Sequence, residues 1–311
     1  MPPIRRLVVV PALAAALTLA GCAASPSASD DGTFTIVTST TVYAQIAEEI
    51  AGDAATVTPI VDSASRDPHE YEATATDQLT VASADLIVVN GGGYDTFVDT
   101  LVDATGSTAP VIVAVDSSPA WIEASGGDHD GADEHDHAIN EHVWYDPEAM
   151  RALAAAIADE LGTLLPADAD AFDSNLADFA AGLDELDTGL ADIAAAHTGA
   201  EVFATEPVAG YLLAAAGLDD VTPADFSEAV EEGQDVPPAT LLDVLSLLGD
   251  GQLSVVVANA QTGGAETTAV IDAATDAGIP VLEFTETLPD GQTYLQWMQQ
   301  NVTDLAEALT P

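Results

Sequence analysis

The sequence contains no lysine, and only four of its 311 residues are basic. Against 53 acidic residues stand four arginines, Arg5, Arg6, Arg66 and Arg151, so the formal net charge is −49. Binding nucleic acid requires many cationic side chains to neutralise phosphates, so this composition excludes nucleic acid as a partner. A phosphate-rich cofactor is disfavoured for the same reason, and no Gly-x-Gly-x-x-Gly or Walker-type loop is present. We expect most of the acidic residues to form a solvated surface, which attracts cations without by itself showing metal binding.

Cysteine is nearly absent, since Cys22 is the only one, and no disulfide can form within the chain. Residues 1–21 have the pattern of a secretory signal, with a basic pair followed by a short apolar stretch. The stretch ends in Leu-Ala-Gly-Cys, which resembles the lipobox of bacterial lipoproteins. We therefore predict a lipid anchor on Cys22 and a flexible tether over residues 22–32. The alternative is an ordinary cleaved signal with an incidental cysteine.

The remaining chain alternates apolar strand patterns with helical patterns, which predicts an α/β fold with parallel sheets. We expect an N-terminal lobe over residues 33–165 and a C-terminal lobe over residues 199–311. Between them, apolar residues recur at spacings of three and four, which predicts one long, rigid connecting helix within residues 166–198. The stripe consists of Phe172, Leu176, Phe179, Leu183, Leu186, Leu190 and Ile193. Residues 117–141 and the acidic residues 225–238 are predicted to be loops, and residues 221–223 a short strand.

Four residues that follow predicted strands or precede helices have side chains able to bind a metal. They are His69, His142, Glu206 and Glu286, a combination of imidazole and carboxylate that suits zinc or manganese. Each is weak evidence alone, because a loop glutamate is usually only solvated and Glu206 before Pro207 has the place of a charge at a helix N-terminus. Ligands bind beyond the carboxyl ends of parallel strands, but spacing alone does not prove that the four meet.

Two other groups of histidines allow simpler interpretations. His129, His135 and His137 lie in an acidic, glycine-containing segment, which is either a solvated loop or an accessory site of weak metal capture. We favour weak metal capture, because half of the six histidines fall within nine positions. His197 ends the predicted connecting helix, where an imidazole interacts well with the helix dipole.

Four motifs give the chain a resemblance to the zinc/manganese solute-binding lipoproteins of ABC transporters, the cluster A-I family. The motifs are Asp67–Glu72, Asn140–Pro147, Thr205–Tyr211 and Thr285–Leu288, and the resemblance covers residues 33–311. It implies two lobes joined by a single long helix, with His69, His142, Glu206 and Glu286 holding a metal between the lobes. The family usually has aspartate at the fourth position, and Glu283 is an alternative ligand to Glu286. Manganese members share the glutamate at the third position, whereas zinc members share the histidine-containing loop; we favour zinc.

The resemblance implies a monomeric binding protein rather than an enzyme, anchored on the outer face of the cytoplasmic membrane and delivering metal to an ABC permease. One alternative is a protein that binds a siderophore-like metal chelate, although only Arg66 and Arg151 are available to bind an anion. A secreted zinc hydrolase with Glu70 as general base is less favoured, because there is no His-Glu-x-x-His. An adhesin role, assigned to some relatives, stays open as a secondary function.

Overall fold

The computed structural model describes residues 33–63, 66, 68–69, 71–124 and 140–310. The predicted leader and tether, with Cys22, lie outside the described residues, and so do His129, His135 and His137. None of the helices in the described ranges combines the length and the apolar content that a membrane span requires.

The first sheet has four parallel strands in the order β2-β1-β3-β4. Its strands are β1 (Phe34–Thr40), β2 (Ala55–Val61), β3 (Leu86–Val89) and β4 (Val111–Val113). The helices between and after them are α1 (Thr41–Ala51), α2 (Ala75–Ala82), α3 (Thr96–Thr105) and α4 (Pro119–Ala124), and α5 (Pro147–Leu164) follows. All four residues of β3 are buried and apolar, as expected for a central parallel strand covered by helices on both faces.

The second sheet repeats this topology in the order β6-β5-β7-β8, again with parallel strands. Its strands are β5 (Glu201–Ala204), β6 (Asp219–Asp220), β7 (Val255–Asn259) and β8 (Val281–Phe284). Its helices are α7 (Gly210–Ala215), α8 (Ala224–Glu231), α9 (Pro238–Gly249), α10 (Ala265–Ala277) and α11 (Tyr294–Ala308). The predicted α/β architecture, with two parallel sheets flanked by helices, is therefore confirmed.

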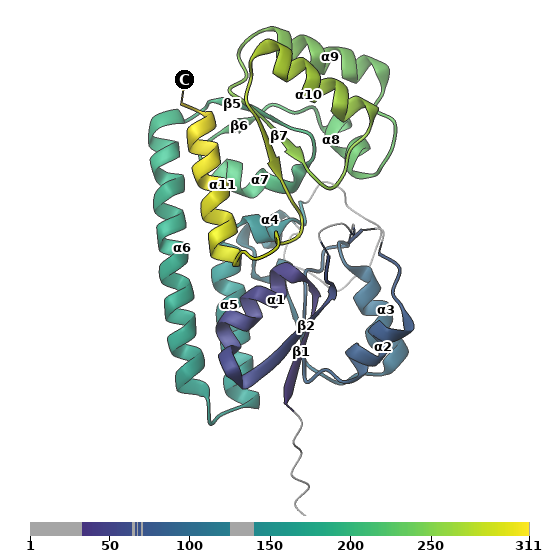
Figure 1. Ribbon diagram of the computed structural model, residues 1–311, viewed down its shortest axis with the longest axis vertical. Helices are drawn as coiled ribbons and strands as arrows, with labels where there is room; N and C mark the ends of the chain where they lie inside the picture. The colour runs from purple at the N-terminus through teal and green to yellow at the C-terminus, as the bar shows by residue number, and fades with distance from the viewer. Residues whose placement is uncertain (1–32, 64–65, 67, 70, 125–139, 311) are drawn as a thin grey trace, which may run out of the picture. The chain divides into compact units, whose positions relative to one another are not determined.

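The long helix α6 (Ala169–His197) runs beside α5 and α11 (Figure 1). Six of the seven residues of the predicted apolar stripe are buried, and Leu176 packs against the same core. Burial of each large aliphatic or aromatic side chain contributes about 1.5–3 kcal/mol, so this face fixes the helix firmly against its neighbours. Two glycines allow the close approach of α11: a Cβ on Gly182 would collide with Leu295, and one on Gly189 would lie 2.9 Å from Val302.

Arg151 joins α5 to α6 through three acceptors. Its guanidinium donates to the carbonyl of Ala180 at 3.1 Å, and it forms ion pairs of 2.9 Å with Asp184 and Asp187. A guanidinium has five donors in a planar fork, so one side chain serves all three acceptors. One of the few cationic side chains in this acid-rich chain, that of Arg151, therefore links α5 to α6.

Three sequence predictions are wrong in detail. The acidic segment 225–238 is not entirely a loop, because α8 occupies its first part and buries Phe226 against Phe203, with ring centroids 5.2 Å apart. The short strand predicted at 221–223 lies instead at Asp219–Asp220, where these two residues pair with Glu201 and Val202 of β5. Residues 117–141 include the short helix α4, which was expected to be loop.

Candidate metal centre

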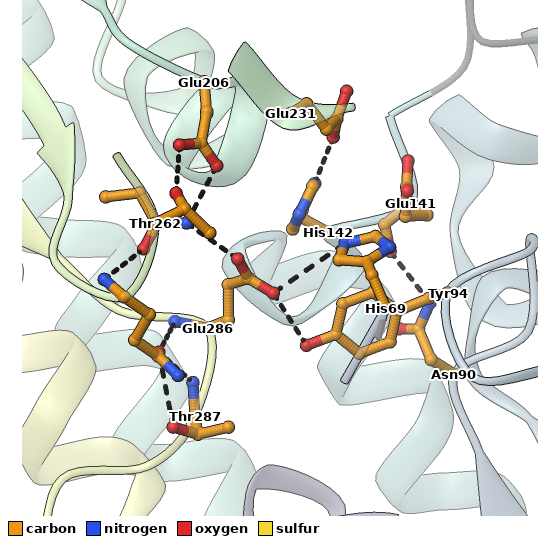
Figure 2. Close-up of polar contacts among 12 residues, drawn as sticks. His69, Asn90, Tyr94, Glu141, His142, Glu206, Glu231, Thr262, Glu286 and Thr287 are labelled. Carbon is orange, nitrogen blue, oxygen red and sulfur yellow. Dashed lines mark hydrogen bonds and ion pairs between the residues drawn. The ribbon is translucent and has the colours of Figure 1, made fainter. Parts of the chain in front are cut away.

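The candidate ligands come from segments that lie far apart in the sequence. His69 follows β2 and Glu286 follows β8, and yet His69 Nε2 lies 3.8 Å from Glu286 Oε2. The carboxyl ends of the two parallel sheets therefore meet at this point. His69, His142 and Glu286 each offer one ligand atom, and these atoms lie within 4.8 Å of one another. Figure 2 shows the histidines and the glutamate converging from different segments.

His142 is held in one tautomer by the residue two positions before it. The ring Nδ1 lies 2.8 Å from Oδ1 of Asn140, which also accepts the backbone N–H of His142 at 2.9 Å. The Asn140 amide donates in turn to the carbonyl of Pro207 at 2.8 Å, so its oxygen is the atom facing the imidazole. Because that oxygen only accepts, Nδ1 carries the proton and Nε2 presents a lone pair. Burial, followed by the proximity of His69, lowers the pKa of His142 well below its ordinary value, so the ring is a neutral, metal-binding imidazole.

The aromatic residues after His142 anchor this segment to both halves of the chain. The ring of Trp144 lies 5.0 Å from that of His142 and 4.8 Å from that of Tyr94. The hydroxyl of Tyr145 donates to the carbonyl of Thr285 at 2.8 Å, one residue before Glu286. Proline at the first position of α5 and the Asp146 side chain at its N-cap then start the helix immediately afterwards. The local sequence therefore places His142 and the Glu286 loop in a fixed relation.

Glu286 is almost completely buried, and both of its oxygens have hydrogen-bond donors. Oε2 accepts the hydroxyl proton of Tyr94 at 3.2 Å, and Oε1 accepts from the Asn259 amide at 2.7 Å. The backbone N–H of Glu286 donates to Gln261 Oε1 at 2.6 Å, which fixes the loop that carries the carboxylate. Burial, followed by the charge of Glu286, raises the pKa of Tyr94 well above its ordinary value, so its hydroxyl remains a donor.

Glu206 lies next to this group but is not among the three residues whose ligand atoms cluster. Its Oε2 accepts from the same Asn259 amide at 2.9 Å, and its Oε1 accepts from the hydroxyl of Thr262. Three of the four predicted ligands thus converge, as Figure 2 shows for His69, His142 and Glu286. Glu206 is joined to Glu286 through the Asn259 amide. Glu283, the alternative to Glu286, is exposed on β8 and lies outside both groups of candidate ligands found among the described residues.

Glu231, at the end of α8, is a further carboxylate beside the centre. Its Oε1 lies 4.0 Å from His142 Nδ1, and Glu141, His142 and Glu231 form a second group of candidate ligand atoms. Burial raises the pKa of Glu231 to about 8, and the charges of Glu141, Glu206, Glu286 and Glu232 add to the effect. A carboxyl beside a neutral imidazole therefore retains its proton at neutral pH, which limits the negative charge at the centre.

Sequence reasoning missed the groups that orient the ligands. Asn259 is the last residue of β7, so the rule that ligands bind at the carboxyl ends of parallel strands points to it. Tyr94 follows three glycines with positive φ, which signal a tight turn but no function. Thr262 and Gln261 lie in a loop after β7 and carry no local signal that distinguishes them from other loop residues.

A model of the family described as "Zinc-uptake complex component A periplasmic" matches residues 36–308. The chain is 31% identical to the manganese-binding lipoprotein MntA of Halalkalibacterium halodurans over 179 residues, which cover 57% of this chain and 56% of that protein. It is 29% identical over 181 residues to the zinc-binding lipoprotein AdcA of Streptococcus pneumoniae strain R6, covering 57% of this chain and 36% of that protein. The match thus spans about half of the first relative and about a third of the second.

Among solved structures, the periplasmic zinc-binding protein TroA from Treponema pallidum superposes with a TM-score of 0.71. It is 20% identical, and the match covers 90% of this chain and all of that one. At this identity the likeness establishes the fold alone, that of two parallel α/β sheets with a long helix.

Proposed function

Because the chain belongs to the family of zinc-uptake complex component A proteins, we propose that it captures a divalent metal ion and delivers it to an ABC permease. The observation that carries the proposal is the convergence of His69, His142 and Glu286, whose ligand atoms lie within 4.8 Å of one another. Glu206 would complete the set from its position beside Asn259. Two imidazoles and two carboxylates offer the ligand types that zinc and manganese accept.

The favoured metal is zinc, with manganese as the alternative. One relative is named as a manganese-binding lipoprotein and another as a zinc-binding lipoprotein. At a site of nitrogen and oxygen ligands, zinc binds more tightly than manganese by the usual order of divalent metals. The neutral state of His142 supports the same choice, because imidazole suits zinc better than it suits harder cations.

The protein would act as a monomeric carrier rather than as an enzyme, in line with relatives named as binding proteins. Capture of an anionic chelate is less well supported. Within the described part of the chain, Arg66 lies 3.7 Å from Asp62, and Arg151 pairs with Asp184 and Asp187. Both arginines therefore already have acidic partners, and neither pairs with a residue of the metal centre.

We also propose that Cys22 carries a lipid that holds the protein on the outer face of the cytoplasmic membrane. The support is the Leu-Ala-Gly-Cys sequence and the lipoprotein names of the relatives. Cells fed an alkyne fatty acid should label the wild-type chain and leave the Cys22→Ser variant unlabelled. Equal labelling of both would overturn the anchor while leaving the metal site unaffected.

Metal analysis of the purified full chain tests the capture of a cation. We expect about one zinc per chain, because the two groups of candidate ligand atoms in the described residues share His142. Excess manganese should not displace this zinc in a competitive titration. Manganese held at one per chain in the presence of modest zinc would assign the protein to manganese transport instead. Absence of either metal after incubation with each would mean that the residues form no site.

A further inference from the structure

Asn259 lies between the two acidic residues of the centre and donates to both. Its Nδ2 is 2.9 Å from Glu206 Oε2 and 2.7 Å from Glu286 Oε1. Asn259 is the last residue of β7 and is 6% exposed. An amide nitrogen carries two protons, so the two carboxylates use its whole donor capacity.

The orientation of this amide is fixed by its own surroundings. Asn259 Oδ1 accepts the backbone N–H of Gln261 at 3.0 Å, which makes it the oxygen and leaves the nitrogen facing the acids. The backbone N–H of Asn259 donates to Thr205 Oγ1 at 3.3 Å, so the residue is also held from the β5 side. A reversed amide would place its oxygen against two carboxylates and its nitrogen against an N–H, and both contacts would be repulsive.

The hydrogen bonds from Asn259 hold two acidic side chains, Glu206 and Glu286, close to each other. Two buried carboxylates in one site disfavour each other's charged form. Here a neutral amide links them through one hydrogen bond to each carboxylate. A cation in the same place would repel the metal.

The hydrogen bonds also restrict which oxygens remain to meet a metal. Glu286 Oε1 accepts a hydrogen bond from Asn259, and Glu286 Oε2 lies 3.8 Å from His69 Nε2. Glu206 gives Oε2 to Asn259, and its Oε1 accepts from Thr262. The other oxygens, Glu286 Oε2 and Glu206 Oε1, accept only from the rotatable hydroxyls of Tyr94 and Thr262. Because the amide fixes one oxygen of each carboxylate while a hydroxyl can turn away from the other, one-oxygen coordination is favoured over bidentate coordination. One-oxygen ligands suit four-coordinate zinc, whereas bidentate carboxylates provide the extra oxygens that suit manganese.

We propose that Asn259 is a positioning residue that sets the metal preference of the centre, by holding Glu206 and Glu286 as one-oxygen ligands. This inference rests on the proposed capture of a divalent metal. It adds a residue outside the four predicted ligands, which acts on the metal through the carboxylates rather than by touching it.

The test compares the dissociation constants for zinc and for manganese in the full chain and two variants. Asn259→Ala removes both donors, and Asn259→Asp removes them with little change of shape. Loss of groups that orient ligands typically weakens metal binding about 10–100-fold. We expect zinc binding to weaken by about that factor in both variants while manganese binding weakens less, so the preference for zinc falls about 10-fold. X-ray absorption of the metal bound to Asn259→Ala, which introduces no carboxylate of its own, should show added oxygen ligands.

The matched control is Asn175→Asp, which removes another amide donor, the half-buried one that bonds to the carbonyl of Ile50 at 2.9 Å. It should leave the ratio of the two constants unchanged even if the melting temperature falls. An unchanged ratio in both Asn259 variants, or a wild-type chain that prefers manganese, would overturn the inference while leaving divalent-metal capture intact. A wild-type chain that binds neither metal would instead overturn the proposed function.

Discussion

The His142→Ala variant is expected to bind zinc more than about 100-fold more weakly than the wild-type chain. Removing a group that merely orients a ligand costs about 10–100-fold, and removing the ligand itself should cost more. His142 is 1% exposed, its Nδ1 proton is committed to Asn140, and Nε2 is the atom left for the metal. Alanine removes that nitrogen and leaves a space beside the rings of Trp144 and Tyr94. Isothermal titration with zinc on the full chain measures the loss.

Two controls separate this effect from other causes. His197→Ala removes an imidazole from the last turn of α6, away from the candidate ligands, and should leave the affinity unchanged. Deletion of residues 128–137 removes three histidines and should also leave the tight site intact, while lowering weak binding of additional metal. Wild-type affinity in His142→Ala would refute the site. Loss of tight binding on deletion of 128–137 would move the site to that segment.

The second large effect concerns salt, because the chain carries 53 acidic residues and four arginines. We expect the melting temperature of the metal-free protein to rise by about 10 °C or more between about 0.1 M and 2 M sodium chloride. The Debye length falls from about 10 Å at 0.1 M to about 3 Å at 1 M, so repulsion between exposed carboxylates is screened. Screening also weakens the few attractive pairs, such as Arg151 with Asp184 and Asp187, but these are far outnumbered.

Thermal unfolding followed by circular dichroism measures this shift. Salts that are excluded from protein surfaces also stabilise folded chains, so chloride is compared with sucrose at concentrations that give equal surface exclusion. Screening predicts a rise with chloride beyond that with sucrose, steepest below about 0.5 M, where the Debye length changes most. A flat or falling melting temperature over that range would mean that the acids are accommodated without net repulsion.

Local sequence signals were sufficient for most of the fold because they record burial directly. The apolar stripe from Phe172 to Ile193 has the period of a helix, and the structure buries that face. The apolar run at Leu86–Val89 is a strand with helices on both faces. Where the signal was ambiguous the prediction was wrong: five acidic residues made 225–238 resemble a loop. Phe226 and Val230, one helical turn apart, were the weaker sign of α8.

The sequence by itself determined the candidate ligand types, since His69, His142, Glu206 and Glu286 are identified by their motifs and by their places after strands or before helices. Only the tertiary structure decided which of them meet, and that Glu206 reaches the others through Asn259. The physical reason is the difference in sequence separation between local and tertiary contacts. Strand and helix periodicities depend on neighbours a few residues apart, whereas the contact of Tyr94 with Glu286 joins positions 192 residues apart and depends on how the two sheets pack.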